Sequence, residues 1–309
     1  MIVSKFGGTS VGSAENIEKV IEIAKQKKEQ VAVVVSALGG VTNQLIRASE
    51  LSLEADPAYE NILDELDTRH RETIDALLQG DFKESALQNL KETLDELRMI
   101  LQGVSLLSDL SGKSAARIVS TGEILSSYLI TMAMKQRGLK ASLKDSRQLI
   151  QTDDTFQNAL VDYDVTYSNI AEFFASTEAE IIVLPGFIAS NEKGETTTLG
   201  RGGSDFTAAL IANGAHADCL EIWTDVSGMY TANPKLVRQA KPIESISYQE
   251  AMELSHFGAK VLYPPTVQPA LDKGIDILIK NTMEPEAPGT RITEKTKVNG
   301  SLIKGISHI

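Results

Sequence analysis

Residues 2–35 decide the fold class, and they have the sequence IVSKFGGTSVGSAENIEKVIEIAKQKKEQVAVVV. Both ends are short apolar runs, at residues 2–6 and 31–35. Between them, the segment 13–27 places its apolar residues at helical spacing on one face. Strands that are apolar on both faces and joined through a helix are typical of a parallel sheet covered by helices. The sequence therefore predicts an α/β fold.

The strand–helix alternation is interrupted between about residue 44 and residue 110 by a segment with long helical periodicity. Its leucine stripe is barely two heptads long, so we expect packing against the same domain rather than a coiled coil. The stripe consists of Leu87, Leu90, Leu94, Leu97 and Leu101. We therefore predict a helical insertion at residues 44–110.

Strand patterns return after this insertion, and they lie at residues 141–144, 180–184, 219–223 and 275–280. A polar segment with glycines at residues 191–203 predicts a hairpin followed by a glycine-rich loop. The α/β alternation therefore continues to the C-terminal part of the chain.

Composition excludes several classes of protein. The chain has 309 residues and is 42% hydrophobic, which is enough for a folded core. One cysteine and four scattered histidines argue against a disulfide framework and a zinc site, and they favour a reducing, cytoplasmic location. A net charge of -12 disfavours nucleic acid and anionic lipid as partners. We therefore expect neither a nucleic-acid partner nor a metal-ligand cluster.

No targeting or membrane segment is expected either. The first residues lack the basic stretch and apolar run of a signal peptide. The longest apolar run, near residues 181–189, is interrupted by Pro185 and Gly186, and it is shorter than the roughly 20 residues of a membrane span. We therefore predict no membrane partner.

Two phosphate-binding motifs are imitated but incomplete. Gly112-Lys113-Ser114 resembles the end of a P-loop, yet Leu107 stands where that motif needs glycine. The segment that begins at Gly200 imitates a dinucleotide fingerprint, but Asp205 occupies the position of its third glycine. Neither a P-loop nor nicotinamide binding is supported.

The first strand is followed by a loop suited to an anion. Lys5 lies near the strand end, and Gly7 and Gly8 let backbone amides approach a polyphosphate before the helix begins. An ordinary β-turn-α junction with a surface lysine remains an equal alternative. The second strand leads into a loop from Ser36 to Thr42 with hydroxyl groups, which alone is a weak signal.

Two further segments carry charged side chains. Glu123 follows Ser-Thr-Gly at the expected start of an apolar helix over residues 124–134, where a helix-capping role is the alternative to ligand binding. Arg201 lies among glycines before a helix expected to begin near Asp205, and its planar guanidinium suits a carboxylate. A flexible loop with an N-cap aspartate is the alternative there.

The last two candidate segments lie in the C-terminal third of the chain. The strand at residues 219–223 ends in a turn that carries Tyr230 and Lys235, which suit a nucleotide base and phosphates. A further lysine, Lys260, follows a helical pattern. The first of these segments could therefore hold a nucleotide, and the second places another lysine beside a helix.

Taken together and in this order, the six segments resemble the aspartokinase branch of the amino acid kinase family, and four stretches of sequence are long matches. They are KFGGTSV (5–11), LGRGGSDF (199–206), EIWTDVSGMY (221–230) and SYQEAMELSHFGAKVL (247–262), and the likeness extends from Met1 to about Gly305. The amino-acid sequence of the last segment is most similar to the kinase part of fused aspartokinase and homoserine dehydrogenase enzymes.

The resemblance implies a three-layer αβα sandwich with a mainly parallel sheet. It implies an amino acid kinase domain over residues 1–290, with an aspartate-binding lobe at 1–195 and an ATP-binding lobe at 196–290. Residues 291–309 would lead toward a regulatory ACT region that this chain lacks. A homo-oligomer is left open.

The implied activity is transfer of the ATP γ-phosphoryl group to the β-carboxylate of L-aspartate. The product would be 4-phospho-L-aspartate, in the first step of lysine, threonine and methionine biosynthesis. Mg²⁺ would arrive with ATP, held largely by phosphate oxygens and water, so no dedicated metal ligands are expected. Phosphoryl transfer to a carboxylate needs positioning and cations more than a base, because that nucleophile is already ionised at neutral pH.

Site residues follow from the motifs that match the family. The resemblance implies catalytic roles for Lys5, Asp205 and Lys260. It implies an aspartate site of Thr42, Glu123, Phe187, Arg201, Ser204 and Asp205, in which Arg201 grips the α-carboxylate and Glu123 the ammonium. It implies an ATP site of Lys5, Gly7, Gly8, Ser36, Thr224, Asp225, Tyr230, Lys235 and Lys260.

The chain departs from the family pattern in two motifs. Asn233-Pro234-Lys235 replaces a usual Asp-Pro-Arg, which removes a bidentate phosphate contact, and Tyr263 replaces a usual histidine. Two rival functions remain: another kinase of the family, such as an acetylglutamate or uridylate kinase, and a catalytically silent ligand-binding subunit.

Overall fold

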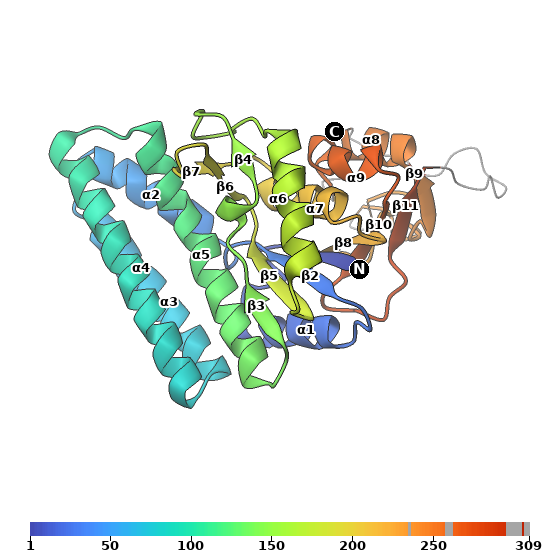
Figure 1. Cartoon of the computed structure of the whole chain (residues 1–309), viewed down its shortest axis with the longest axis horizontal. Coiled ribbons are helices and arrows are strands. Elements are labelled where there is room, and N and C mark those ends of the chain that lie inside the picture. The colour runs from blue at the N-terminus through green and yellow to red at the C-terminus, as the bar shows by residue number, and fades with distance from the viewer. Residues whose placement is uncertain (234–235, 257–261, 295–304, 306–309) are drawn as a thin grey trace.

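A central eight-stranded sheet organises the molecule (Figure 1). The computed structural model describes residues 1–233, 236–256, 262–294 and 305. The strands of the sheet follow the order β3-β5-β2-β1-β8-β10-β11-β9, and only β10 and β11 run antiparallel. The predicted α/β fold with a mainly parallel sheet is therefore confirmed.

The strands of the main sheet are β1 (Ile2–Phe6), β2 (Val31–Val35), β3 (Ala141–Leu143), β5 (Ile181–Pro185), β8 (Cys219–Thr224), β9 (Ser245–Ser247), β10 (Asp276–Asn281) and β11 (Thr290–Thr293). A second sheet joins β4 (Gln151–Thr152), β6 (Ile188–Asn191) and β7 (Thr196–Thr198) in the order β4-β6-β7. All six strands expected from apolar runs are present, and no bound is shifted by more than one residue.

Helices cover both faces of the main sheet. The first group is α1 (Ala14–Lys25), α2 (Val41–Leu53), α3 (Tyr59–Leu77), α4 (Gly80–Leu107) and α5 (Gly112–Gln136). The second group is α6 (Tyr163–Ser176), α7 (Gly203–Gly214), α8 (Tyr248–His256) and α9 (Gln268–Asp272), with short 3-10 turns at η1 (Ser146–Gln148) and η2 (Pro264–Val267). Each group encloses its own apolar core, which gives the predicted three layers.

Strand β2 shows why the sheet is central. Val31, Val33 and Val35 belong to the core under α1–α5, whereas Ala32 and Val34 belong to the core under α6–α9. Because successive strand residues point to opposite faces, a strand between two cores must be apolar at every position. This is the pattern that the sequence carries.

The predicted helical insertion forms a bundle of α2, α3 and α4 against α5, and α3 and α4 lie farthest from the sheet (Figure 1). Four of the five stripe leucines are buried in this bundle, and Leu87 is partly buried. The stripe therefore packs within the domain, as expected.

The predicted start of the helix near Glu123 is wrong. Helix α5 begins at Gly112, so Glu123 lies in its middle and cannot cap its N-terminus. The hydroxyl group of Ser120 donates to the carbonyl of Arg117 one turn earlier, at 2.8 Å, instead of capping a new helix. A serine inside a helix therefore imitated a helix start.

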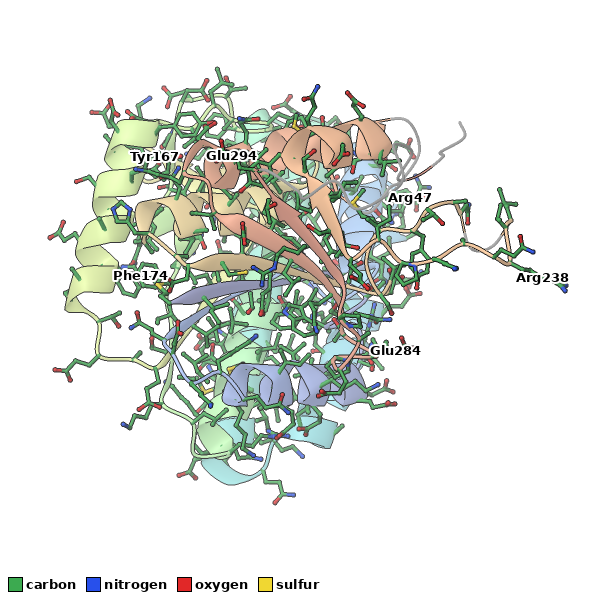
Figure 2. The ribbon with its side chains drawn as sticks, turned by 90° about the vertical axis from the view of Figure 1, so that its right-hand side faces the viewer. Arg47, Tyr167, Phe174, Arg238, Glu284 and Glu294 are labelled. Carbon is green, nitrogen blue, oxygen red and sulfur yellow. The ribbon has the colours of Figure 1, made fainter. Side chains whose placement is uncertain are left out.

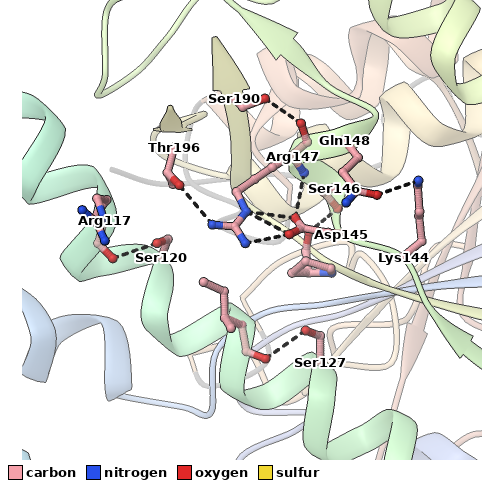
Figure 3. A network of polar contacts seen from close by, with 12 residues as sticks. Arg117, Ser120, Ser127, Lys144, Asp145, Ser146, Arg147, Gln148, Ser190 and Thr196 are labelled. Carbon is pink, nitrogen blue, oxygen red and sulfur yellow. Dashed lines mark hydrogen bonds and ion pairs between the residues drawn. The ribbon is translucent and has the colours of Figure 1, made fainter. Parts of the chain in front are cut away.

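The predicted hairpin at residues 191–203 is confirmed as β6 and β7, and polar contacts anchor it to η1 (Figure 3). The guanidinium of Arg147 pairs with Asp145 and donates to the hydroxyl of Thr196 on β7 at 3.1 Å. Ser190 on β6 donates to the carbonyl of Arg147 at 2.6 Å. These contacts fix the hairpin that precedes the glycine-rich loop before α7.

The predicted lobe boundaries fall at two particular places. The step from residue 195 to 196 lies in the β6–β7 hairpin, and residue 290 is the first residue of β11.

Between β8 and β9 the chain projects away from the body, with Arg238 far out on this projection (Figure 2). Among the helices in the described ranges, none has the length and apolar character to cross a membrane.

Candidate active site

The carboxyl ends of several parallel strands meet at one edge of the main sheet, where α/β proteins bind ligands. The loops after β1, β2 and β5 and the N-terminus of α7 enclose a cavity of about 280 Å³ there. Its lining residues are Lys5, Gly8, Ser36, Ala37, Gly39, Gly40, Thr42, Glu123, Phe187, Gly200, Gly202, Gly203, Ser204 and Asp205. Eight of the predicted site residues are among them, namely Lys5, Gly8, Ser36, Thr42, Glu123, Phe187, Ser204 and Asp205.

Lys5 and Asp205 form an ion pair inside this cavity. The Lys5 Nζ lies 2.7 Å from Asp205 Oδ1, and the two side chains are 13% and 12% exposed. Lys5 belongs to β1 between β2 and β8, and Asp205 to the first turn of α7. The Lys5 ammonium is therefore held at the carboxyl edge of the sheet by the Asp205 carboxylate on α7.

Two glycine loops supply unpaired backbone donors to the cavity. In the described part of the chain, the N–H groups of Gly8, Gly39 and Gly40 make no hydrogen bond. Gly40 has φ of 89°, a left-handed value that glycine adopts readily, and it caps the N-terminus of α2. Free N–H groups at a helix N-terminus form a site for an anion.

Glu123 projects from α5 into the same cavity as a buried carboxyl group. Its Oε1 accepts a hydrogen bond from the N–H of Ala37 at 3.1 Å, whereas Oε2 is buried without a hydrogen-bond partner. Burial raises the pKa of Glu123 to about 8. A side chain at Gly122 would lie 2.6 Å from the Ala37 Cβ, so glycine permits this close approach. The site thus contains a buried acceptor that lacks a donor.

Hydroxyl groups and one strained aromatic residue close the cavity. Ser36 Oγ donates to Ser204 Oγ at 2.9 Å and so joins the β2 loop to α7. Phe187 has φ of 69°, which is uncommon for a residue with a side chain, and its N–H donates to Thr207 Oγ1 at 3.0 Å. Strained residues of this kind cluster at ligand sites. Thr42, at the start of α2, completes the lining.

Other predicted residues lie outside the cavity. Arg201 is exposed, and its guanidinium carbon lies 5.3 Å from the centre of the Tyr263 ring. Thr224 is the last residue of β8, the neighbour of β1, and its Oγ1 donates to Oδ1 of the following Asp225 at 3.2 Å. Tyr230 forms a bridge to Pro242 in the next segment. The structure therefore does not bring these four residues into the cavity.

Two predicted lysines, Lys235 and Lys260, lie outside the described residues. Gly7 is described, and its N–H donates to the carbonyl of Trp223 at 3.3 Å, which ties the first glycine loop to the end of β8. Of the residues predicted to bind ATP, some therefore lie in or next to the cavity, and two lie outside the described residues.

Sequence reasoning missed several contributors to this site. Gly39 and Gly40 line the cavity and repeat the glycine pair that follows β1, so the same signal could have found them. Arg69, on α3, donates to the carbonyls of Gly39 and Gly12. Its partners lie 30 and 57 residues away in the chain, and no sequence pattern marks such a contact.

Comparison with known proteins finds relatives among the aspartokinases, the group that the sequence motifs resemble. An aspartokinase of Chlamydia pneumoniae is 38% identical over 94% of this chain and 62% of its own length. A bifunctional aspartokinase/homoserine dehydrogenase of Buchnera aphidicola is 35% identical over 100% of this chain and 38% of its own.

The crystal structure of Escherichia coli aspartokinase III in complex with aspartate and ADP has a TM-score of 0.88 at 34% identity, covering 96% of this chain and 65% of that one. The chain thus spans between 38% and 65% of the length of these three relatives. The profile of the Amino acid kinase family matches residues 1–281. By this match over most of its length, the chain belongs to the amino acid kinase family.

Proposed function

We propose that this chain is an aspartate kinase that transfers the γ-phosphoryl group of ATP to the β-carboxylate of L-aspartate, giving 4-phospho-L-aspartate. One observation carries the proposal: a single cavity joins a lysine, a buried carboxyl group that lacks a donor, and the free N–H groups of two glycine loops. These groups suit a phosphate, an ammonium and a carboxylate. The aspartokinase relatives support the same substrates.

Phosphoryl transfer at this site would depend on charge neutralisation. The β-carboxylate of aspartate is ionised at neutral pH, so no general base is required to activate it. Lys5 would stabilise the charge on the transferring phosphoryl group, and Asp205 keeps its ammonium in place. The free N–H groups of Gly8, Gly39 and Gly40 would hold phosphate oxygens, with Gly7 beside them in the first loop.

Aspartate recognition would depend on the buried end of the cavity. Glu123 Oε2 is buried without a hydrogen-bond partner, and the ammonium of an amino acid would supply one. Thr42, Phe187 and Ser204 would enclose the substrate. Arg201 would grip the α-carboxylate, which requires its side chain to leave the ring of Tyr263.

ATP would extend from the cavity toward the end of β8, with Thr224, Asp225, Tyr230, Lys235 and Lys260 as its contacts and Ser36 beside the phosphates. In the described ranges, no group of three or more His, Cys, Asp or Glu side chains could hold a metal ion. Mg²⁺ would therefore enter bound to the phosphates of ATP, and the exposed Asp225 would be a nearby carboxylate ligand. Mg²⁺ would neutralise phosphate charge.

An acyl phosphate reacts with hydroxylamine to give a hydroxamate, which provides a direct test. The chain is incubated with MgATP, hydroxylamine and one of aspartate, glutamate, N-acetylglutamate or UMP, and ADP release is measured in parallel. We expect hydroxamate and ADP with aspartate alone. Product with N-acetylglutamate or UMP would favour the rival kinases, and no ADP release with any substrate would favour a silent binding subunit.

A further inference from the structure

The side chain of Arg69 joins the two glycine loops of the site from outside. It comes from α3 in the helical insertion, and its Nη1 donates to the carbonyl of Gly39 at 2.7 Å. Its Nη2 donates to the carbonyl of Gly12 at 3.1 Å. One planar guanidinium therefore spans the loop after β1 and the loop after β2.

Arg69 differs from its neighbours in having carbonyls rather than carboxylates as partners. Arg71, two residues further along α3, pairs with Asp67 at 2.6 Å, and Arg98 on α4 pairs with Glu60 at 2.9 Å. In the described chain no carboxylate forms an ion pair with Arg69. A surface ion pair therefore does not account for its position.

In the described chain, no direct backbone hydrogen bond joins residues 7–12 of the first loop to residues 37–40 of the second. A side chain at Gly8 would lie 3.2 Å from the carbonyl oxygen of Ala37, and one at Gly39 would lie 3.0 Å from that of Gly8. The loops touch through bare backbone, and glycine restricts its own φ and ψ less than any other residue. Val11 and Leu38 anchor the two loops in the apolar core, and Arg69 adds a polar contact that spans their backbones.

The carbonyl contact also orients a donor. The C=O and N–H groups of a trans peptide unit point in opposite directions. When the Gly39 carbonyl points at Arg69, the N–H of Gly40 points the other way, and Gly40 lines the cavity. A cation on the carbonyl also polarises the peptide unit, which makes its N–H a stronger donor.

We propose that Arg69 is a positioning residue, which holds the two glycine loops together so that their free N–H groups converge on the phosphoryl group in transfer. The inference rests on the proposed kinase activity and adds a residue that touches neither substrate. A lysine provides a single point charge and cannot span two carbonyls with a planar fork. Arg69→Lys therefore separates geometry from charge.

The test compares Arg69→Lys with Arg71→Lys, a matched change on the same helix at an arginine that pairs with Asp67. For both variants, kcat, both KM values, melting temperature and amide hydrogen exchange are measured. The reporter amides are those of Ser10, Val11 and Val41, which donate within the two loops. Their exchange is followed with and without MgADP.

We expect Arg69→Lys to lower kcat/KM for MgATP by about 10- to 100-fold, because small misplacements of catalytic groups carry losses of this size. The reporter amides should exchange faster in this variant, and Arg71→Lys should match the wild type in both measurements. A kcat/KM within twofold of the wild type, or a lower melting temperature with unchanged loop exchange, would overturn the proposal. If the wild type itself shows no turnover, the proposed function fails, and loop exchange still decides whether Arg69 holds the loops.

Discussion

Lys5 Nζ and Asp205 Oδ1 lie 2.7 Å apart, although 200 residues of chain separate them. The pair joins the central strand β1 to the first turn of α7, and both side chains are largely buried. Removing one partner of a buried ion pair leaves an uncompensated charge. The pair therefore contributes to folding as well as placing a cation in the cavity, and a test of Lys5 must separate the two effects.

Lys5→Ala should lower kcat far more than either KM. Loss of one preorganised cationic donor costs about 3–4 kcal/mol in the transition state, or a few hundredfold in rate. Because Asp205 loses its partner, the melting temperature should also fall, so rates are measured well below it. Lys19→Ala is the control, since Lys19 pairs with exposed Glu15 on α1. A Lys5→Ala kcat within threefold of wild type would remove Lys5 from the mechanism.

Glu123→Gln should make the protein more stable at high pH. The pKa of Glu123 is raised by burial from 4.5 to about 8. Between these values the folded chain retains a proton that the unfolded chain releases, so the free energy of unfolding falls as pH rises from 4.5 to 8 and is constant above. Glutamine cannot ionise, and the gain over wild type should reach a few kcal/mol, or about 1.4 kcal/mol per pH unit.

Denaturant unfolding at pH 5 and pH 8 measures this effect, with Glu15→Gln on α1 as the exposed control. The Glu123→Gln variant should also bind aspartate more weakly than the wild type, because an amide lacks the charge that pairs with the ammonium. In the wild type, aspartate affinity should rise with pH up to about 8, where Glu123 ionises, and this rise should vanish in Glu123→Gln. Equal pH dependence of stability in both proteins would contradict the buried, protonated state.

His70 should make the helical insertion sensitive to acid. Its Nδ1 lies 2.7 Å from the carbonyl oxygen of Leu66, Nε2 is buried without a hydrogen-bond partner, and burial lowers the pKa of His70 below 6.5. The unfolded chain therefore binds a proton first, and the free energy of unfolding falls as pH drops below 6.5. His70→Gln should show a shallower loss in acid than the wild type. Exposed His216→Asn is the control, and an unchanged acid slope in His70→Gln would refute the effect.

The fold was predictable wherever burial on both faces determined the residue type. The five successive apolar residues of β2 are required by its two cores, and they are visible in the sequence without any structure. The start of α5 was not predictable, because Ser120 and Glu123 have the spacing of a capping box. The bounds of α5, the burial of Glu123 and its contact with Ala37 show that Glu123 is a buried group inside a helix.

The site was predictable where one local motif supplied a residue, as for Lys5, Ser204 and Asp205. It was not predictable where the contact depends on how distant elements pack. Arg69 occupies a helix whose sequence indicates only alternating buried and polar positions, and its two carbonyl partners carry no side-chain signal. The position of Arg201 on Tyr263 depends on two loops in the same way.

Arg201→Lys tests whether the arginine outside the cavity recognises substrate. In this structure the guanidinium lies over the ring of Tyr263, so recognition requires it to move when aspartate binds. Lysine keeps the charge but loses the planar fork that grips a carboxylate through two bonds. If Arg201 grips the α-carboxylate, the aspartate KM should rise by about 10- to 100-fold, or roughly 1.5–3 kcal/mol, with the KM for ATP little changed.

A loop arginine that only stacks on Tyr263 leads to a different result. Its replacement would alter the melting temperature and leave both KM values unchanged, because stacking in the open loop contributes to stability alone. Arg291→Lys provides the matched control, since Arg291 is exposed on β11 and pairs with Asp276 at 2.8 Å, away from the cavity. Steady-state kinetics and thermal unfolding of the two variants decide the question. An aspartate KM that stays at the wild-type value in Arg201→Lys would exclude the arginine from substrate recognition and leave the groups that line the cavity, Glu123 among them, to recognise the amino acid backbone.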